Sequence, residues 1–104
     1  MFSNILSKHA NEVNMLCKAY SVKNLFAFGS VVSEKFDERK SDLDFLVELQ
    51  QTNDPLQIGE NMLNLWNGLE QTFNRPVDLV RIENVHNPIL KAQIEKTKVL
   101  VYAA

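Results

Sequence analysis

The sequence of 104 residues has little of what several common classes of protein require. Its one cysteine, Cys17, excludes an internal disulfide and a cysteine-based zinc site within one chain. Glycine and proline contribute three residues each, so the composition is neither fibrous nor of low complexity. No apolar run approaches the length of a membrane span, and the first residues have no basic leader of the kind that begins a signal peptide. A net charge of −2 gives no general attraction to nucleic acid or to anionic membranes. We therefore expect a cytoplasmic protein that binds neither directly.

What the chain does contain is an ordinary globular composition, with 45% hydrophobic and 23% charged residues. Its length is enough for one compact domain, which we expect to span residues 1–104. Helical spacing of apolar residues predicts a helix over residues 2–20. Asp54 as N-cap, Pro55 at the first position and Gln57 at the third predict a capping box that begins another helix.

The remaining pattern alternates between the two kinds of element. Short apolar runs predict strands. Ser30 near an N-terminus predicts the start of one short helix, and Asn87-Pro88 predicts the start of another. The predicted strands cover residues 25–28, 42–49, 76–82 and 99–102, the last as a strand or an extended tail; the two short helices cover residues 30–36 and 87–96. The order α-β-α-β-α-β-α-β predicts an α/β (α+β) fold, a small mixed sheet with helices packed mainly on one face.

Several side chains have an ordinary structural interpretation. His9 lies on the apolar stripe of the first helix, so we expect it to be packed rather than to bind a metal. Cys17 is expected in the core, as are Trp66 and Phe73. Three lysines near the end of the chain are expected to form a solvated face: Lys91, Lys96 and Lys98.

Three aspartates lie in or beside apolar strand patterns. Asp42 and Asp44 open one predicted strand, and Asp78 lies inside another. Alternate residues of a strand point to the same face, so Asp42 and Asp44 point the same way. With Asp78 on an adjacent strand, the three carboxylates form an oxygen-only set that suits Mg²⁺. Two such ions would clamp the attacking and leaving oxygens of a phosphoryl displacement.

A Gly-Ser pair precedes the acids. The apolar run 25–28 is followed by Gly29-Ser30, and eleven residues separate Ser30 from Asp42. Glycine lets a backbone approach a phosphate closely, and a serine at a helix start can donate to phosphate oxygens. Neither Gly-Ser nor Asp-x-Asp is specific alone, but their combination favours a metal and nucleotide site.

Each acid also has a plainer interpretation. Asp42 is explained equally by a surface loop that it caps or ends, and Asp44 by the solvent side of a half-exposed strand. Asp78 is explained by an ion pair with Arg75 or Arg81, which would contribute little at a surface. The metal site is favoured because all three acids occur in strand patterns downstream of Gly-Ser.

Together, Gly29-Ser30, the spacer, Asp42-x-Asp44 and Asp78 resemble the minimal nucleotidyltransferases of the DNA polymerase β superfamily. The resemblance runs from the first helix to the final apolar segment. It implies the nucleotidyltransferase fold, with Asp42 and Asp44 holding two Mg²⁺ ions and the triphosphate of ATP. Asp78 would hold the ion at the acceptor hydroxyl and align or deprotonate that hydroxyl. Gly29 and Ser30 would bind the β- and γ-phosphates, and a nucleoside monophosphate, AMP in the case of ATP, would pass to the acceptor while pyrophosphate leaves.

The resemblance also implies a partner. Many such small family members act as the antitoxin of a HEPN-domain toxin, some by adding AMP to a tyrosine of the toxin. We therefore expect a hetero-oligomer with a HEPN-domain protein as acceptor. A module that neutralises its partner by occlusion, without chemistry, is the first alternative. Transfer to a small molecule such as an aminoglycoside is the second.

The loop after Ser30 departs from the family pattern. Members often read Gly-Ser-x-Ala-Arg-Gly there, whereas residues 31–36 contain no arginine, and the spacer is about one residue longer than the common ten. Lys35, Arg39 or Lys40 is a candidate replacement for the missing cation. The departure bears more on nucleotide affinity than on metal binding, and it favours the occlusion alternative.

Overall fold

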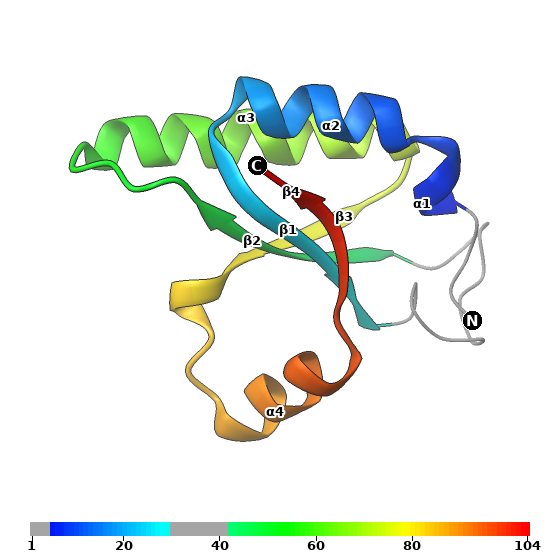
Figure 1. Cartoon of the computed structure of the whole chain (residues 1–104), viewed down its shortest axis with the longest axis vertical. Helices are drawn as coiled ribbons and strands as arrows, with labels where there is room; N and C mark the ends of the chain where they lie inside the picture. Colours follow the sequence, from blue (N-terminus) through cyan, green and yellow to red (C-terminus); the bar gives the residue numbers. More distant parts are fainter. Residues whose placement is uncertain (1–4, 30–41) are drawn as a thin grey trace.

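The computed structural model describes residues 5–29 and 42–104. Its centre is a four-stranded sheet in the order β3-β2-β1-β4, drawn in Figure 1. The strands are β1 (Val22–Phe28), β2 (Leu43–Leu49), β3 (Val77–Arg81) and β4 (Val99–Ala103). β1 is antiparallel to both β2 and β4, and β2 is parallel to β3, so the sheet is mixed as predicted.

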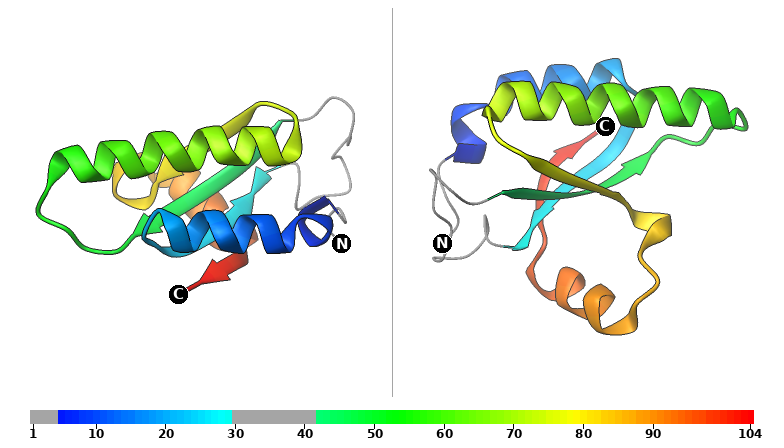
Figure 2. Two further views of the ribbon diagram at one scale, coloured as in Figure 1. Left: turned by 90° about the horizontal axis from the view of Figure 1, so that it is seen from above. Right: turned by 180° about the vertical axis from the view of Figure 1, so that it is seen from behind.

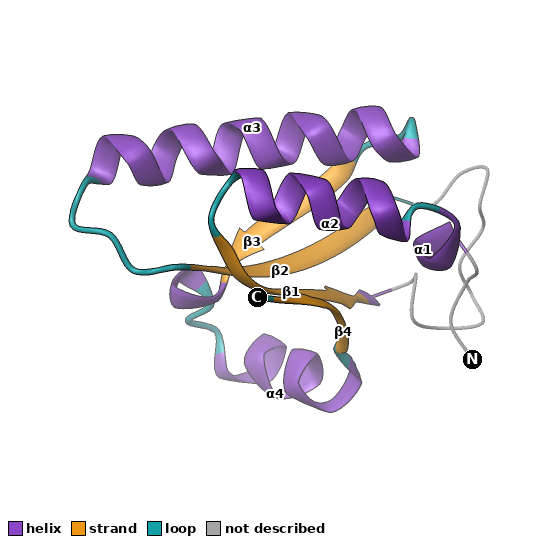
Figure 3. Ribbon diagram, turned by 45° about the horizontal axis from the view of Figure 1, so that its top comes forward, coloured by secondary structure: helices purple, strands orange, loops and turns teal. Residues whose placement is uncertain are grey.

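Helices lie on both sides of the sheet, but unequally. The helices α1 (Ile5–Lys8), α2 (Ala10–Ala19) and α3 (Pro55–Phe73) lie on one side, and α4 (Pro88–Thr97) lies on the other (Figures 2 and 3). This confirms the expectation that the helices pack mainly on one face. None of the helices that the structure describes is long and apolar enough to cross a membrane.

The two faces of β2 explain this arrangement. Leu43, Phe45 and Val47 alternate along the strand, are fully buried, and belong to the core under α2 and α3. Leu46 points to the opposite face and is 1% exposed, because Ile94 of α4 lies beside it across a small cavity. α4 therefore covers the middle of the second face with a few apolar side chains.

Close packing of α2 against α3 depends on a glycine. A Cβ placed on Gly68 would lie 2.5 Å from Leu16 Cδ2, so this position of α3 has room only for a hydrogen. Leu16 packs against the core at that point, together with the buried Val13 and Cys17 of the same helix. From residue 5 onward, the apolar stripe predicted for the first helix thus packs into the core; residues 2–4 lie outside the described residues.

The start of α3 follows local sequence rules, but one half of the predicted capping box does not form. Asp54 caps the helix and accepts a hydrogen bond from the Leu56 amide at 3.0 Å, and Pro55 occupies the first turn. The reciprocal half of the predicted capping box is wrong. Gln57 donates to Asn61 Oδ1 at 3.1 Å, and the Asp54 amide donates to the Thr52 hydroxyl instead. The nearer hydroxyl satisfies the amide that Gln57 was expected to satisfy.

The other helices and strands differ only in detail. The first helix is broken at His9 into α1 and α2; the apolar spacing continues across the break, so it gave no sign of it. His9 packs edge-on to Phe73 at 5.1 Å between ring centroids, as a packed residue should. β1 begins at Val22, three residues earlier than predicted, and β4 is a true strand.

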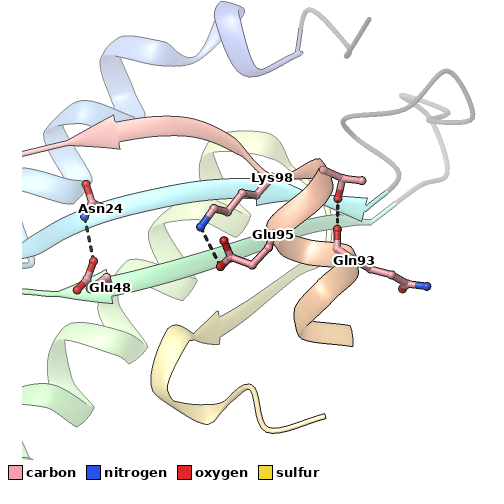
Figure 4. Close-up of polar contacts among 6 residues, drawn as sticks. Asn24, Glu48, Gln93, Glu95 and Lys98 are labelled. Carbon is pink, nitrogen blue, oxygen red and sulfur yellow. Dashed lines mark hydrogen bonds and ion pairs between the residues drawn. The ribbon is translucent and has the colours of Figure 1, made fainter. Parts of the chain in front are cut away.

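Two predicted environments are wrong. Trp66 is 44% exposed rather than in the core, because its indole N–H donates to the sheet edge at Val77 O, 2.7 Å away. Lys98 is not simply solvated: its ammonium lies 4.4 Å from the centroid of the Phe26 ring and 3.1 Å from a Glu95 carboxylate oxygen. Figure 4 shows the Lys98–Glu95 pair beside α4. Phe73 is buried as expected, and Lys91 and Lys96 are exposed.

Candidate functional site

Asp44 and Asp78 lie side by side on the two parallel strands of the sheet. Residue 44 of β2 is in register with residue 78 of β3, which places their α-carbons about 4.8 Å apart. Asp42 comes directly before β2. The three acids therefore gather at the end of the sheet where both parallel strands begin, as the sequence predicted.

Strand alternation points Asp44 and Asp78 away from the main core. The neighbours of Asp44 in the chain, Leu43 and Phe45, are fully buried under α2 and α3, so Asp44 points to the opposite face. Asp44 is half-buried, while Asp42 and Asp78 are exposed. The same face holds α4, and further along it Glu48 accepts a hydrogen bond from the Asn24 amide across β1 and β2 (Figure 4). The apolar strand pattern thus fixes the backbone and leaves the carboxylates accessible.

Gly29 meets the Asp44 side chain at the end of β1. Phe28 pairs with Asp44 in the sheet, so the next residue, Gly29, lies beside the Asp44 carboxylate. A Cβ on Gly29 would overlap Asp44 Oδ2, and φ of Gly29 is +74°, a conformation that other residues rarely adopt. Glycine at this position therefore makes room for the carboxylate itself. Ser30 and the rest of residues 30–41, including the predicted short helix and the three candidate cations, lie outside the described residues.

The carboxylates act on one another electrostatically. Burial raises the pKa of Asp44, and the negative charges of Asp78 and Asp42 raise it further. A group of like charges held together in this way is stabilised by a cation, and oxygen-only ligands are those that Mg²⁺ prefers. The chemistry of these donors therefore fits a hard divalent ion.

The acidic side chains of the described residues do not form a complete metal site in this structure. Within residues 5–29 and 42–104, no three His, Cys, Asp or Glu side chains form a group that could hold a metal. Asp78 does not pair with Arg81, which instead forms an ion pair with Glu83 at the other end of β3. Arg75 donates to the Phe73 carbonyl at 3.4 Å. The metal roles of the three acids therefore remain a prediction.

Two residues of α3 lie beside the site, and the sequence did not mark them as part of it. The indole N–H of Trp66 donates to Val77 O at 2.7 Å, and Glu70 Oε2 accepts from the Val77 amide at 2.9 Å. Val77 directly precedes Asp78. The sequence shows that Trp66 and Glu70 are four residues apart, as neighbours on one face of a helix are. Nothing in the sequence indicates that their side chains reach the edge of a strand.

A separate hollow lies at the far end of the same strands. Its volume is about 520 Å³, and its lining is mostly polar. It lies between the end of β2, the start of α3 and the 3-10 turn Ile82–Asn84, and none of the three aspartates lines it. The chemistry predicted from the sequence belongs to the acid end of the sheet and not to this hollow.

Known proteins place this arrangement in a family. Residues 11–104 match the family model described as "Polymerase beta, Nucleotidyltransferase". The chain is 34% identical over 97 residues to "Putative protein adenylyltransferase MJ1379" of Methanocaldococcus jannaschii, covering 93% of this chain and 91% of that protein. This chain belongs to the polymerase β nucleotidyltransferase family.

Solved structures agree with that assignment. A structure described as a "putative minimal nucleotidyltransferase" superposes with a TM-score of 0.67 at 25% identity, covering 95% of both chains. A chain of a second structure, a tri-AMPylated Shewanella oneidensis HEPN toxin in complex with its MNT antitoxin, superposes with a TM-score of 0.61 at 18% identity. That match covers 95% of this chain and 73% of the other, and it shows a shared fold. Within the family, this protein thus resembles its small, single-core members.

Proposed function

We propose that this protein is a Mg²⁺-dependent adenylyltransferase that moves AMP from ATP to a hydroxyl of a HEPN-domain partner, and so acts as the partner's antitoxin. The observation that carries the proposal is the in-register pair Asp44 and Asp78 beside Gly29, on a chain of the nucleotidyltransferase family. The similarity to a named protein adenylyltransferase supports AMP as the transferred group. The shared fold with a chain of the HEPN–MNT complex supports the choice of partner.

Each acid has a role that follows from its position. Asp42 directly precedes β2 and Asp44 lies within it, so the two would hold, through divalent ions, the triphosphate end of the nucleotide, which leaves as pyrophosphate when AMP is transferred. Asp78, one strand away, orients the acceptor hydroxyl and takes up its proton. Gly29, which directly follows β1, and Ser30, the next residue in the sequence, would contact the phosphates. When bound, Mg²⁺ ions would neutralise charge on the phosphates and lower the pKa of the attacking hydroxyl.

The proposal places the whole chain, residues 1–104, in one catalytic domain in the cytoplasm. It makes the active form a hetero-oligomer, because the acceptor is another protein.

The test is transfer of label from α-³²P-ATP to a HEPN-domain protein encoded beside this one. Wild type with Mg²⁺ should label the partner, and the Asp42→Asn/Asp44→Asn double variant should not, while still binding the partner. Asp54→Asn is the control, because it also replaces an aspartate by asparagine, at a position away from the site where asparagine caps a helix as well as aspartate does. Labelling by the double variant at the wild-type rate would contradict the proposal.

A second candidate function is neutralisation by occlusion without transfer. The feature in its favour is the loop after Ser30, which lacks the arginine common in the family. Under this function, the double variant would protect cells from the toxin as well as wild type does. Under the proposed function, that protection is lost although the complex still forms.

A further inference from the structure

We propose that Trp66 and Glu70 of α3 are positioning residues for Asp78, acting through the backbone of Val77. The inference rests on the proposed function for the role of Asp78. Its structural part concerns contacts within this chain and can be tested without any transfer reaction.

β3 is an edge strand and is held by the sheet on one side only. Among residues 5–29 and 42–104, the strand order places β2 beside it and no strand beyond it. In a parallel strand, the N–H and C=O of one residue point to one side, and those of the next residue point to the other. The Pro76 carbonyl accepts from the Leu43 amide of β2, so Asp78 also points its backbone groups toward β2 and Val77 points its groups outward.

α3 supplies both partners that a missing neighbour strand would supply to Val77. The Trp66 indole N–H donates to the Val77 carbonyl at 2.7 Å, and a Glu70 carboxylate oxygen accepts from the Val77 amide at 2.9 Å. The two residues are four apart on the helix, so their side chains lie on one face. Val77 also buries its own side chain in the core and is 4% exposed.

These contacts fix the residue that carries the third carboxylate. The Val77 peptide groups are held by α3 and the Asp78 peptide groups by β2, so the α-carbon of Asp78 lies between two anchored peptides. The half-exposed position of Trp66 has no explanation from packing, but it follows directly from its hydrogen bond. Without the two α3 side chains, the Val77 peptide groups would lose both hydrogen-bond partners, only the burial of the Val77 side chain would hold β3 from the α3 side, and Asp78 would move relative to Asp44.

The competing interpretation is that the pair only protects a sheet edge from association with other chains. A protective role predicts a loss of stability or solubility and nothing else. A positioning role predicts weaker binding of the metal ion and a lower rate of transfer, with nucleotide affinity retained.

The test uses three variants and one control in the full chain. Glu70→Ala removes the acceptor, Glu70→Gln keeps an acceptor oxygen, and Trp66→Phe keeps a ring but removes the N–H. Glu60→Ala, at an exposed position of the same helix, is the control. We expect kcat for transfer to fall about 10- to 100-fold in Glu70→Ala and several-fold in Trp66→Phe. Glu70→Gln and Glu60→Ala should stay within about twofold of wild type, and KM for ATP should change little in all four.

A second readout needs no reaction. Mn²⁺ alone, followed by water proton relaxation, should bind several-fold more weakly to Glu70→Ala and Trp66→Phe and normally to Glu70→Gln. If wild type transfers no nucleotide, the proposed function fails, and the Mn²⁺ titration still decides the positioning role. Wild-type kcat and Mn²⁺ affinity in Glu70→Ala would overturn the inference, even if that variant melts at a lower temperature. If Glu70→Ala does not fold, Trp66→Phe, judged by the same two readouts, decides the inference.

Discussion

Gly29 lies so close to the Asp44 carboxylate that an added Cβ would change the site. We expect Gly29→Ala to reduce transfer at least 10-fold, because its Cβ would displace the Asp44 carboxylate. Its positive φ should also cost about 1–2 kcal/mol of stability. Transfer kinetics and urea denaturation measure the two effects.

The matched control is Gly59→Ala in α3. A Cβ there meets no atom within 4 Å, so the change adds only helix propensity, about 0.5–1 kcal/mol in favour of folding. Its transfer rate should equal that of wild type. Normal transfer by Gly29→Ala would mean that the carboxylate has room to move, contrary to this account.

Asp44 illustrates a conflict between stability and function. In the absence of divalent ions, its charge is partly buried and repelled by Asp78 and Asp42. We expect Asp44→Asn to raise the free energy of unfolding by about 0.5–1 kcal/mol in EDTA. Mg²⁺ should stabilise wild type and not the variant, as thermal melts with and without the ion would reveal. A variant less stable than wild type in EDTA would contradict the assigned repulsion.

Cys17 gives a pH-dependent prediction away from the site. Burial raises the pKa of its thiol from 9.0 to about 12, so the folded protein resists ionising it. The unfolded chain loses this proton above pH 9, and stability should therefore fall as pH rises from about 9 toward 12. Cys17→Ala should lose less stability than wild type over that interval in urea denaturation series. At pH 8, the wild-type thiol should react with a thiol reagent only in denaturant; fast reaction of the native protein would place Cys17 at the surface.

At the scale of the element, the start of α3 shows which of its two predicted capping interactions stabilises the helix. Asp54→Ala should destabilise the protein by about 1 kcal/mol, since it leaves the Leu56 amide without its acceptor. Asp54→Asn should be neutral. Gln57→Ala should cost no more than about 0.5 kcal/mol, because Gln57 bonds to Asn61 and not to the Asp54 amide. Equal losses for Asp54→Ala and Gln57→Ala in urea denaturation would mean that the full capping box forms after all.

Local patterns predicted most helices and strands because each pattern reflects a single buried face. The apolar run of β2 and the apolar stripe of α2 each contribute residues to the core, as expected. The break at His9 was not predictable, because the stripe continues through it. Nor was the two-sided burial of β2 at Leu46, which depends on where the distant α4 folds back.

The sequence likewise predicts one part of the candidate site and not another. Asp44 and Asp78 were expected together because both lie in apolar runs that form neighbouring strands, and the register confirms their proximity. Trp66 was taken for core because its spacing fits an apolar stripe. Its hydrogen bond to Val77 spans eleven residues and joins a helix to a strand edge, and no periodicity within either element contains that information.

At the scale of the whole molecule, the fold separates stability from chemistry. The face under α1, α2 and α3 holds most of the core, and the opposite face carries the acids at one end and α4 further along (Figure 3). Changes to the carboxylates therefore need not disturb the core. This is why the Asp42→Asn/Asp44→Asn double variant is a clean test of function.

Under the proposed function, the net charge of −2 and the three aspartates should make nucleotide binding dependent on a metal ion. A triphosphate is repelled by these groups unless cations intervene. We expect ATP affinity to fall at least 10-fold when Mg²⁺ is replaced by EDTA, as measured with a fluorescent ATP analogue. Equal affinity in EDTA would indicate binding that does not use the carboxylates.

The most direct test of the account is the intact mass of the HEPN-domain partner after incubation with this protein, ATP and Mg²⁺. The account predicts a gain of one or more AMP groups on the partner with wild type, and no gain with the Asp42→Asn/Asp44→Asn double variant. A stable complex in which the partner's mass does not change would contradict it and would favour neutralisation by occlusion.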